Sequence, residues 1–446
     1  MAVGAAILVL ACASTATAAP GSMASRAVAV RLSAHAALLT IPRHEPSQYV
    51  LVHGDHGWRY PRRTVERGGL LRATLPVSPR ARHIRVLVIR GWHQTHLRLR
   101  LRVREDRISG SSLESCGPLV VPTPGERPPA CWRPYSPASP FNQLLPPDPR
   151  LDDRTGDIVA QVTSHGPPQN LVAGWAGTDN DWGRPTYFAH EGDPSYTLHC
   201  TKPGDSCPIE GDVIQIPAGA RPAGGGDAHL TVIDPDTGWE YGLWDVGSMP
   251  PGGGELDFGS GARTRLDGDG IEPDRVNGGN AAGFGSAAGL LRAEELGAGA
   301  INHALFITVR CDNGSYVYPA VHSGSACPTA SERAAAPAMG QRLQLDMSDA
   351  QIDALGAPPW KRTLLRAMAH YGMFVGDTGG DSWTIGFESG VEYLSFGRPD
   401  RWVGLARAWQ VPFDAGDNTY VFPVRDGVDW PSRLRVVAPC VSARDC

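Results

Sequence analysis

The residues best suited to chemistry lie on two short alternating runs around a turn. Residues 227–234 read DAHLTVID, residues 239–245 read WEYGLWD, and a Pro-Asp-Thr-Gly segment separates the two runs. Two alternating runs around such a turn predict a β-hairpin. We expect Asp234 to pair with Trp239. Because side chains alternate between the two faces of a strand, this register decides which residues share a face. One face then carries His229, Thr231, Glu240 and Trp244, and the other carries Leu230, Val232, Tyr241 and Leu243.

A face with an imidazole, a hydroxyl, a carboxylate and an indole is suited to binding sugars. An indole stacks on the apolar side of a sugar ring while neighbouring polar groups hold its hydroxyls. We therefore predict a groove in which Trp244 is the platform and Asp227 and Thr231 contact the substrate. The alternative is that Trp244 is a core residue and His229 is only a hydrogen-bonded one.

Three functions remain open for such a surface. A glycoside hydrolase needs two carboxyl groups, and Glu240 with either Asp234 or Asp245 is the predicted set, although alternation puts Asp245 on the opposite face. A polysaccharide lyase would use His229, His303 or Tyr371 to abstract a proton, with arginine neutralising a uronate carboxylate. A non-catalytic glycan- or cell-wall-binding protein would need only the aromatic surface. The hydrolase is our leading hypothesis.

Two further segments carry these proposed bases. Residues 301–309 alternate and are followed by an Asn313-Gly314 turn and residues 316–318, which predicts a second hairpin bearing His303. A histidine among aliphatic residues is more often a core residue than a catalyst. Residues 359–371 have helical spacing and open on prolines, which predicts a helix ending near Tyr371. Asp377 follows in a turn and is capable of proton transfer.

Residues 267–274 alternate aspartate with glycine, as some calcium loops do. Ile271 and Gly278 occupy positions where an EF-hand needs oxygen ligands, so we expect a solvated turn and no metal, with a calcium site as the alternative. The sequence contains no nucleophile elbow, P-loop or HExxH motif. Serine hydrolase, nucleotide-dependent and zincin functions are therefore unsupported, and no cofactor is expected.

Composition indicates an exported, mostly β protein. The chain has 446 residues with 53 Gly, 39 Pro and a net charge of −5, which favours turn-rich β structure and gives no case for nucleic acid binding. Residues 1–19 resemble an export signal, or a lipoprotein signal that would acylate Cys12, and no other run is long enough for an integral membrane span. The eight remaining cysteines fall into four local pairs, which predicts disulfides and a secreted protein.

The charge is distributed unevenly along the chain. Residues 21–107 hold 17 arginines and five acidic residues, or +12, which leaves −17 for the rest. Five alternating runs, near residues 28–32, 49–53, 70–75, 83–90 and 97–104, predict an immunoglobulin-like β-sandwich over residues 20–108. Its arginine face is either a solvated surface, an anchor for an anionic polymer or a surface that docks on the acidic remainder.

A linker over residues 109–131 then leads to the main domain over residues 132–446. We predict a larger β-sandwich or jelly-roll with a few short helices, acting as a monomer on a polysaccharide or cell-wall glycan. Four segments of it resemble a group of secreted bacterial proteins with no assigned activity: residues 139–142, 227–245, 280–305 and 364–377. The resemblance spans about residues 132–390 and implies one recurring domain, but it implies no catalytic residues.

Overall fold

A computed structural model describes the strands between residues 28 and 103, and residues 126–446 except 203–206 and 277. The chain divides into two units, Met1–Ser112 and Leu113–Cys446, and each is described by itself. The predicted export signal and most of the predicted linker lie outside the described residues.

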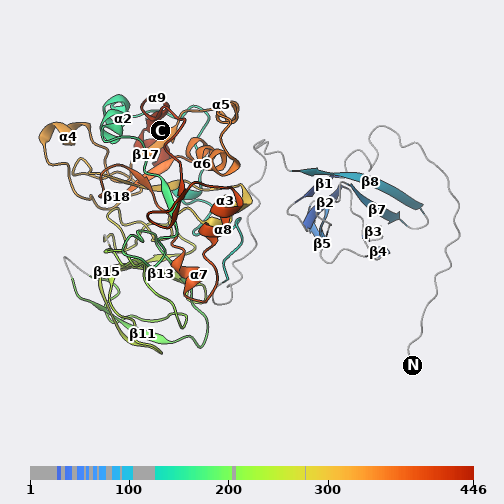
Figure 1. Cartoon of the computed structure of the whole chain (residues 1–446), viewed down its shortest axis with the longest axis horizontal. Coiled ribbons are helices and arrows are strands. Elements are labelled where there is room, and N and C mark those ends of the chain that lie inside the picture. Colours follow the sequence, from blue (N-terminus) through green and yellow to red (C-terminus); the bar gives the residue numbers. More distant parts are fainter. Residues whose placement is uncertain are drawn as a thin grey trace. The chain divides into compact units, whose positions relative to one another are not determined.

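Eight strands of the first unit form one sheet in the order β4-β3-β7-β8-β1-β2-β6-β5 (Figure 1). All five alternating runs found in the sequence contain a strand. The long strand β8 pairs with β7 over one part and parallel to β1 over another, so it joins two antiparallel groups of four strands. The strands are β1 (Val28–Arg31), β2 (Ala36–Pro42), β3 (Gln48–Gly54), β4 (Gly57–Arg59), β5 (Thr64–Arg67), β6 (Leu70–Pro76), β7 (His83–Arg90) and β8 (His93–Val103).

A six-stranded sheet of the second unit has the order β10-β13-β14-β15-β11-β12. Its pairs are antiparallel except β10 with β13 and β11 with β15, which run parallel. One face buries a core that includes Tyr196, Leu198, Val232 and Phe258. The strands are β10 (Thr186–Phe188), β11 (Ser195–Cys200), β12 (Val213–Gln215), β13 (Leu230–Asp234), β14 (Trp239–Val246) and β15 (Gly254–Arg265).

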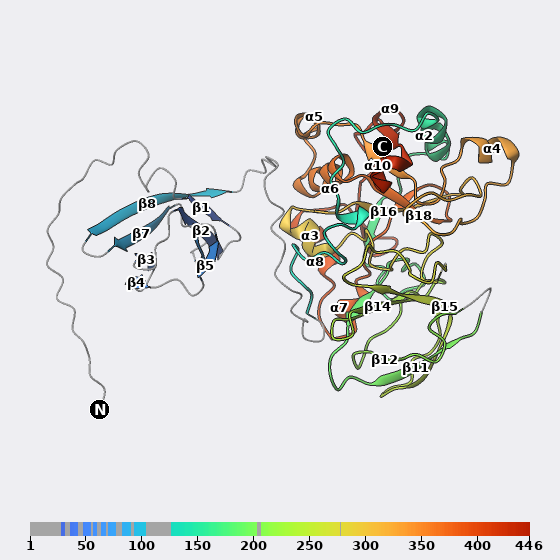
Figure 2. The same ribbon diagram turned by 180° about the vertical axis from the view of Figure 1, so that it is seen from behind.

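A five-stranded sheet in the order β19-β16-β18-β17-β22 forms the other half of this unit, as both views show (Figures 1 and 2). It packs in the largest core together with helices and with a small sheet, β20-β21-β9. The strands are β9 (Leu171–Ala173), β16 (Leu305–Val309), β17 (Arg342–Leu345), β18 (Met373–Thr378), β19 (Thr384–Ile385), β20 (Phe413–Asp414), β21 (Thr419–Phe422) and β22 (Leu434–Val437).

Most of the helices lie around the five-stranded sheet (Figure 2). The predicted helix is confirmed as α6, which has a proline at its first turn and buries Trp360, Leu364 and Met368. The short 3-10 helix η1 covers Pro140–Asn142. The α-helices are α2 (Thr155–Thr163), α3 (Ala293–Ala298), α4 (Ala330–Ala335), α5 (Asp349–Ala354), α6 (Pro359–His370), α7 (Val391–Leu394), α8 (Arg401–Ala408), α9 (Trp430–Arg433) and α10 (Pro439–Ala443).

The second predicted hairpin is wrong. Strand β16 pairs with β18 and β19 instead of with residues 316–318, and Tyr316 forms only an isolated bridge to Met339. The turn signal at Asn313-Gly314 is local, with a left-handed φ of 80° at Gly314, and it opens a loop closed by the Cys311–Cys327 disulfide. A turn motif specifies the bend, but it does not specify which strand lies beside β16.

The mostly β class is confirmed, whereas neither the sandwich nor the jelly-roll arrangement is. Three predicted disulfides are present: Cys200–Cys207, Cys311–Cys327 and Cys440–Cys446. Cys131 is also disulfide-bonded, and its predicted partner Cys116 lies outside the described residues. Within the described part of the chain, none of the helices has the length and apolar character needed to cross a bilayer.

Candidate functional site

The β13–β14 hairpin has the predicted register. Asp234 pairs with Trp239, Thr231 with Gly242 and Leu230 with Leu243. The predicted core face is buried, with Leu230, Val232 and Leu243 fully covered. The opposite face therefore carries the polar residues, as alternation requires.

The middle of that opposite face is covered by a glycine-rich segment, residues 278–286. A Cβ placed on Gly242 would lie 1.8 Å from Ser286 Oγ, and one on Gly278 would lie 2.3 Å from the carbonyl carbon of Gly261. Only chain without side chains at these points can approach so closely. Ser286 thus occupies the space beside Gly242, and just one end of the hairpin face remains open.

Glu240 lies beneath this segment and has structural partners. Its carboxylate accepts hydrogen bonds from the Tyr135 hydroxyl at 2.6 Å and from the backbone N–H of Ala287 at 2.9 Å. Its side chain is 1% exposed, and burial raises its pKa above the ordinary value. The Glu240 carboxylate thus links the end of the glycine-rich segment to the sheet. It lies outside the cleft that is described next.

The open end of the hairpin faces a cleft of about 840 Å³, a size typical of ligand sites. Both large sheets contribute to its walls, together with the segment after β9 and the loop after β18. Three predicted residues, Asp227, His229 and Trp244, lie there together. The walls include Trp175, Trp182, Arg184, Asp227, His229, Trp244, Ser260, Phe306, Ser325, Asp377, Asp381 and Phe387.

Trp244 and Asp227 form one unit of the cleft wall. The indole N–H of Trp244 donates to Asp227 Oδ1 at 3.0 Å, which orients that carboxylate. The indole ring packs on Gly259, where an added Cβ would lie 2.9 Å away, and the Lys202 ammonium lies 4.9 Å from the ring centroid. Trp244 is therefore half-buried, and Gly259 and Lys202 cover part of its ring.

Arg184 and Asp377 form an ion pair in the wall of the same cleft. Arg184 Nη2 donates to Asp377 Oδ2 at 2.9 Å, while the guanidinium carbon lies 4.4 Å from the centre of the Phe306 ring. Arg184 Nη1 is buried and has no hydrogen-bond partner among the described residues. Burial raises the pKa of Asp377, the Arg184 charge opposes this, and the Asp227 carboxylate raises that pKa further.

His229 is a buried imidazole, 6% exposed, beside these charges. Burial lowers its pKa well below the ordinary value of 6.5, the Arg184 charge lowers it again, and a hydrogen bond to the Leu243 backbone acts in the opposite direction. The imidazole is therefore neutral near pH 7, and a neutral imidazole offers one acceptor nitrogen.

Two indoles that the sequence analysis did not select lie in the cleft as well. Trp182 is 56% exposed and Trp175 is half-buried. The buried carboxylate of Asp181 positions the turn between them by accepting hydrogen bonds from Gly177 N–H at 2.8 Å and Ser389 Oγ at 2.7 Å. An accessible indole beside carboxylates is the arrangement that sugar stacking requires.

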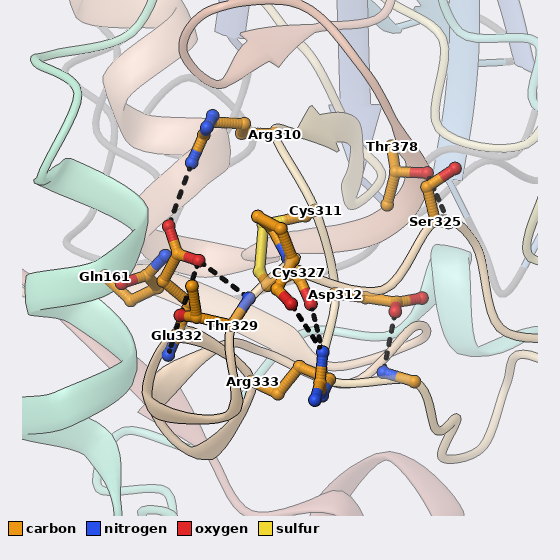
Figure 3. Close-up of a disulfide and its surroundings, with 12 residues drawn as sticks. Gln161, Arg310, Cys311, Asp312, Ser325, Cys327, Thr329, Glu332, Arg333 and Thr378 are labelled. Carbon is orange, nitrogen blue, oxygen red and sulfur yellow. Dashed lines mark hydrogen bonds and ion pairs between the residues drawn. A yellow bond between two sulfur atoms is a disulfide. The ribbon is translucent and has the colours of Figure 1, made fainter.

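The loop closed by the disulfide drawn in Figure 3 supplies one rim of the cleft. Cys311–Cys327 closes it, and Arg333 donates to the Cys327 carbonyl at 2.7 Å. Residues 323–325 line the cleft, and the Ser325 N–H donates to Thr378 Oγ1 at 2.8 Å, directly after Asp377. The disulfide thus positions a segment of the cleft wall.

The remaining predicted site residues do not line the cleft. Asp234 caps the hairpin turn by accepting from Asp236 N–H and Thr237 N–H, and Asp245 pairs with Lys202. Thr231 is buried, with its backbone N–H donated to the Pro185 carbonyl. These positions give all three residues structural contacts at the edges or interior of the sheet.

His303 and Tyr371 are also buried away from the cleft. His303 Nε2 lies 3.1 Å from both oxygens of Glu295, and its Nδ1 lies 2.9 Å from the Ala304 carbonyl. The Tyr371 backbone carbonyl accepts from Arg342 Nε at 2.7 Å where α6 ends. Both residues lie among core side chains, which was the alternative for His303.

Within the described residues, one group of side chains has the spacing of metal ligands: Cys200, Cys207 and Glu210. The two cysteines are joined in a disulfide, so neither offers a thiolate. In the aspartate-glycine loop, Asp267 pairs with Arg265 at 3.0 Å and Asp269 accepts from the Ile271 N–H at 3.1 Å. Both carboxylates therefore make contacts that stabilise the turn in which they lie.

Sequence reasoning missed Arg184, Trp175 and Trp182, and it noted Asp377 only as capable of proton transfer. These residues lie in segments without an alternating or helical pattern of apolar residues. No sequence pattern therefore predicts that they lie beside the hairpin. Comparison with known proteins found no matching protein-family model, no matching curated protein and no matching solved structure.

Proposed function

We propose that the chain is a secreted glycoside hydrolase and that its cleft binds and cleaves a polysaccharide. The observation that supports this most directly is the pair Asp227 and Asp377 in one cleft with accessible indoles. The pair interacts electrostatically, because the Asp227 charge raises the pKa of Asp377. The disulfides fit an oxidising compartment, as secretion requires.

The two carboxyl groups have different surroundings, as the two roles in glycoside hydrolysis require. Asp377, whose pKa burial raises, is the proton donor to the leaving oxygen. Asp227, oriented by the Trp244 indole, is the nucleophile or the base that activates water. Trp182 provides the stacking surface, and Arg184 holds Asp377 in place.

The charge of the cleft favours a neutral or amino-sugar glycan. Among the described residues that line the cleft, Asp227, Asp377 and Asp381 carry three negative charges when ionised, against the one positive charge of Arg184. A polyuronate would meet net repulsion there, since like charges in a cleft disfavour binding. This counts against the lyase.

A lyase is nevertheless the second candidate, because one specific observation favours it. His229 is neutral near pH 7, as a base for proton abstraction must be, and Arg184 Nη1 lacks a hydrogen-bond partner among the described residues. That nitrogen could neutralise a substrate carboxylate. The two reactions leave different products, so one screen separates them.

The test is a panel of neutral, amino-sugar and uronate polysaccharides, assayed for new reducing ends and for ultraviolet absorbance of unsaturated sugars. We expect reducing ends without absorbance. Asp377→Asn and Asp227→Asn should each lower the rate about 10²- to 10⁴-fold, the usual contribution of such a group. The matched carboxylate control is Glu240→Gln, which should stay within about threefold because Glu240 lies outside the cleft.

Each other result replaces the proposal. Absorbing products lost in His229→Ala would establish the lyase. Binding without any turnover, abolished by Trp182→Ala, would establish a glycan-binding protein. Wild-type rates in both aspartate variants, with loss of activity in Glu240→Gln, would mean that the hairpin residues form the catalytic site.

A further inference from the structure

Arg184 and His229 are neighbours in the wall of the cleft. Strands β10 and β13 run parallel with Thr186 opposite Thr231. Arg184 and His229 each come two residues before this pair, so their side chains belong to the same face of adjacent chain segments, about 4.8 Å apart. Burial and then the Arg184 charge lower the pKa of His229, which agrees with this placement. The guanidinium and the imidazole therefore form one continuous polar surface.

Arg184 has a hydrogen-bond donor that the protein does not use. Its Nη2 donates to Asp377 at 2.9 Å, and the guanidinium lies on the Phe306 ring. Nη1 is buried and has no hydrogen-bond partner among the described residues. A buried donor without a partner costs free energy, so a ligand oxygen that accepts from it is bound more tightly than one in water.

His229 provides the complementary acceptor. One nitrogen of its neutral ring donates to the Leu243 backbone, so the other nitrogen is an acceptor. In the part of the chain that the structure describes, no second hydrogen bond joins this buried imidazole to another residue. A ligand that satisfies both side chains must therefore accept a hydrogen bond from Arg184 and donate one to His229.

Aromatic surface lies beside this polar pair. Phe306 and Phe387 both line the cleft, and the Phe387 side chain is half-buried. The guanidinium carbon of Arg184 lies 4.4 Å from the centre of the Phe306 ring, and the Arg184 backbone N–H donates to the Phe387 carbonyl at 3.0 Å. A small apolar group on a ligand bound by Arg184 and His229 can therefore contact an aromatic ring instead of water.

We propose that the cleft selects a glycan of N-acetylated amino sugars, whose acetamido group Arg184 and His229 bind. The acetamido carbonyl accepts from Arg184 Nη1, the amide N–H donates to the free nitrogen of His229, and the methyl group contacts the aromatic wall. A hydroxyl at the same ring position lacks the methyl group. A free amine, once protonated, only donates hydrogen bonds and is repelled by the Arg184 charge. The inference rests on the proposed function, since it assumes that the cleft holds a glycan.

The test compares binding of chitin, chitosan and cellulose oligosaccharides of equal length to the full chain. The three share one backbone and carry an acetamido group, an amine or a hydroxyl at the same ring position. Binding is read as the change in tryptophan fluorescence on mixing, before turnover, because Trp175, Trp182 and Trp244 line the cleft. We expect the chitin oligosaccharide to bind at least about tenfold more tightly than either of the others, because it alone satisfies both buried groups.

Variants of His229 assign this preference to the pair. His229→Ala should weaken binding of the chitin oligosaccharide about tenfold and change binding of the cellulose oligosaccharide less than about twofold, which also shows that the cleft is folded. His229→Gln keeps a side-chain acceptor and should recover part of the lost affinity. The control is His199→Ala, which removes an exposed imidazole outside the cleft and should change neither affinity.

The outcomes separate this inference from the proposed function. Equal affinity for the chitin and cellulose oligosaccharides, tighter binding of chitosan, or wild-type affinity for chitin in both His229 variants would each overturn the inference. Preference for chitin without new reducing ends from any polysaccharide would overturn the glycoside hydrolase and leave the acetamido site in place. Cleavage of a glycan without any preference for the acetamido group would do the reverse.

Discussion

Arg127, near the start of the second unit, pairs with two glutamates of a buried acidic cluster next to the cleft wall. Arg127 pairs with Glu388 at 2.5 Å and with Glu392 at 3.2 Å, and all three side chains are at most 5% exposed. Glu294 lies close enough to raise the pKa of both glutamates, although burial is the larger cause for each. Arg292 also lowers the pKa of Glu388 and Arg401 pairs with Glu294 at 3.5 Å, yet burial keeps the pKa of Glu388 and Glu392 above the ordinary value.

The variant Glu392→Gln tests this balance. Burial and the Glu388 charge raise the folded-state pKa of Glu392 above the ordinary value of 4.5. The folded protein therefore holds a proton that the unfolded chain releases, and Glu392 costs stability as pH rises above about 4.5. We expect Glu392→Gln to gain stability relative to the wild type between pH 5 and pH 8, measured as the difference in free energy of unfolding by urea. A relative loss over that interval would mean that Arg127 keeps Glu392 ionised throughout.

At the scale of elements, the Cys311–Cys327 loop links a covalent bond to the shape of the cleft. Its disulfide spans 16 residues, so removing it should cost about 3 kcal/mol through the entropy of the unfolded chain. Because residues 323–325 line the cleft, Cys311→Ser/Cys327→Ser should also raise KM for the glycan about three- to tenfold and leave kcat within about twofold. The control is Cys440→Ser/Cys446→Ser, whose disulfide spans six residues near the chain end. That control should lower stability by about 2 kcal/mol and leave KM unchanged. Equal KM values in Cys311→Ser/Cys327→Ser and in the control would show that the rim loop keeps its position without the disulfide.

The same scale shows what the sequence could predict. Alternation and a turn motif determined the β13–β14 register, because a one-residue slip would expose Leu230 and Leu243. They could not show what covers the opposite face. Glu240 had the right chemistry and the right face, but the segment carrying Gly278 and Ser286 lies over it. Arg184 and Asp377 are 193 residues apart, and nothing local in either segment points to the other.

For the whole molecule, every residue of the cleft wall belongs to the second unit, and we expect that unit to act without the first. The second unit has its own cores, built from residues between Trp132 and Val436, as an independently folding domain does. A chain that begins at Leu113 keeps both Cys116 and Cys131 and every residue of the cleft wall. It should unfold cooperatively and cleave a soluble neutral glycan within about twofold of the full-length rate.

Turnover of the soluble glycan, measured on the full-length and the truncated chain at one salt concentration, tests this expectation. A folded truncated chain with at least tenfold lower turnover on the soluble glycan would show that the first unit contributes to the cleft.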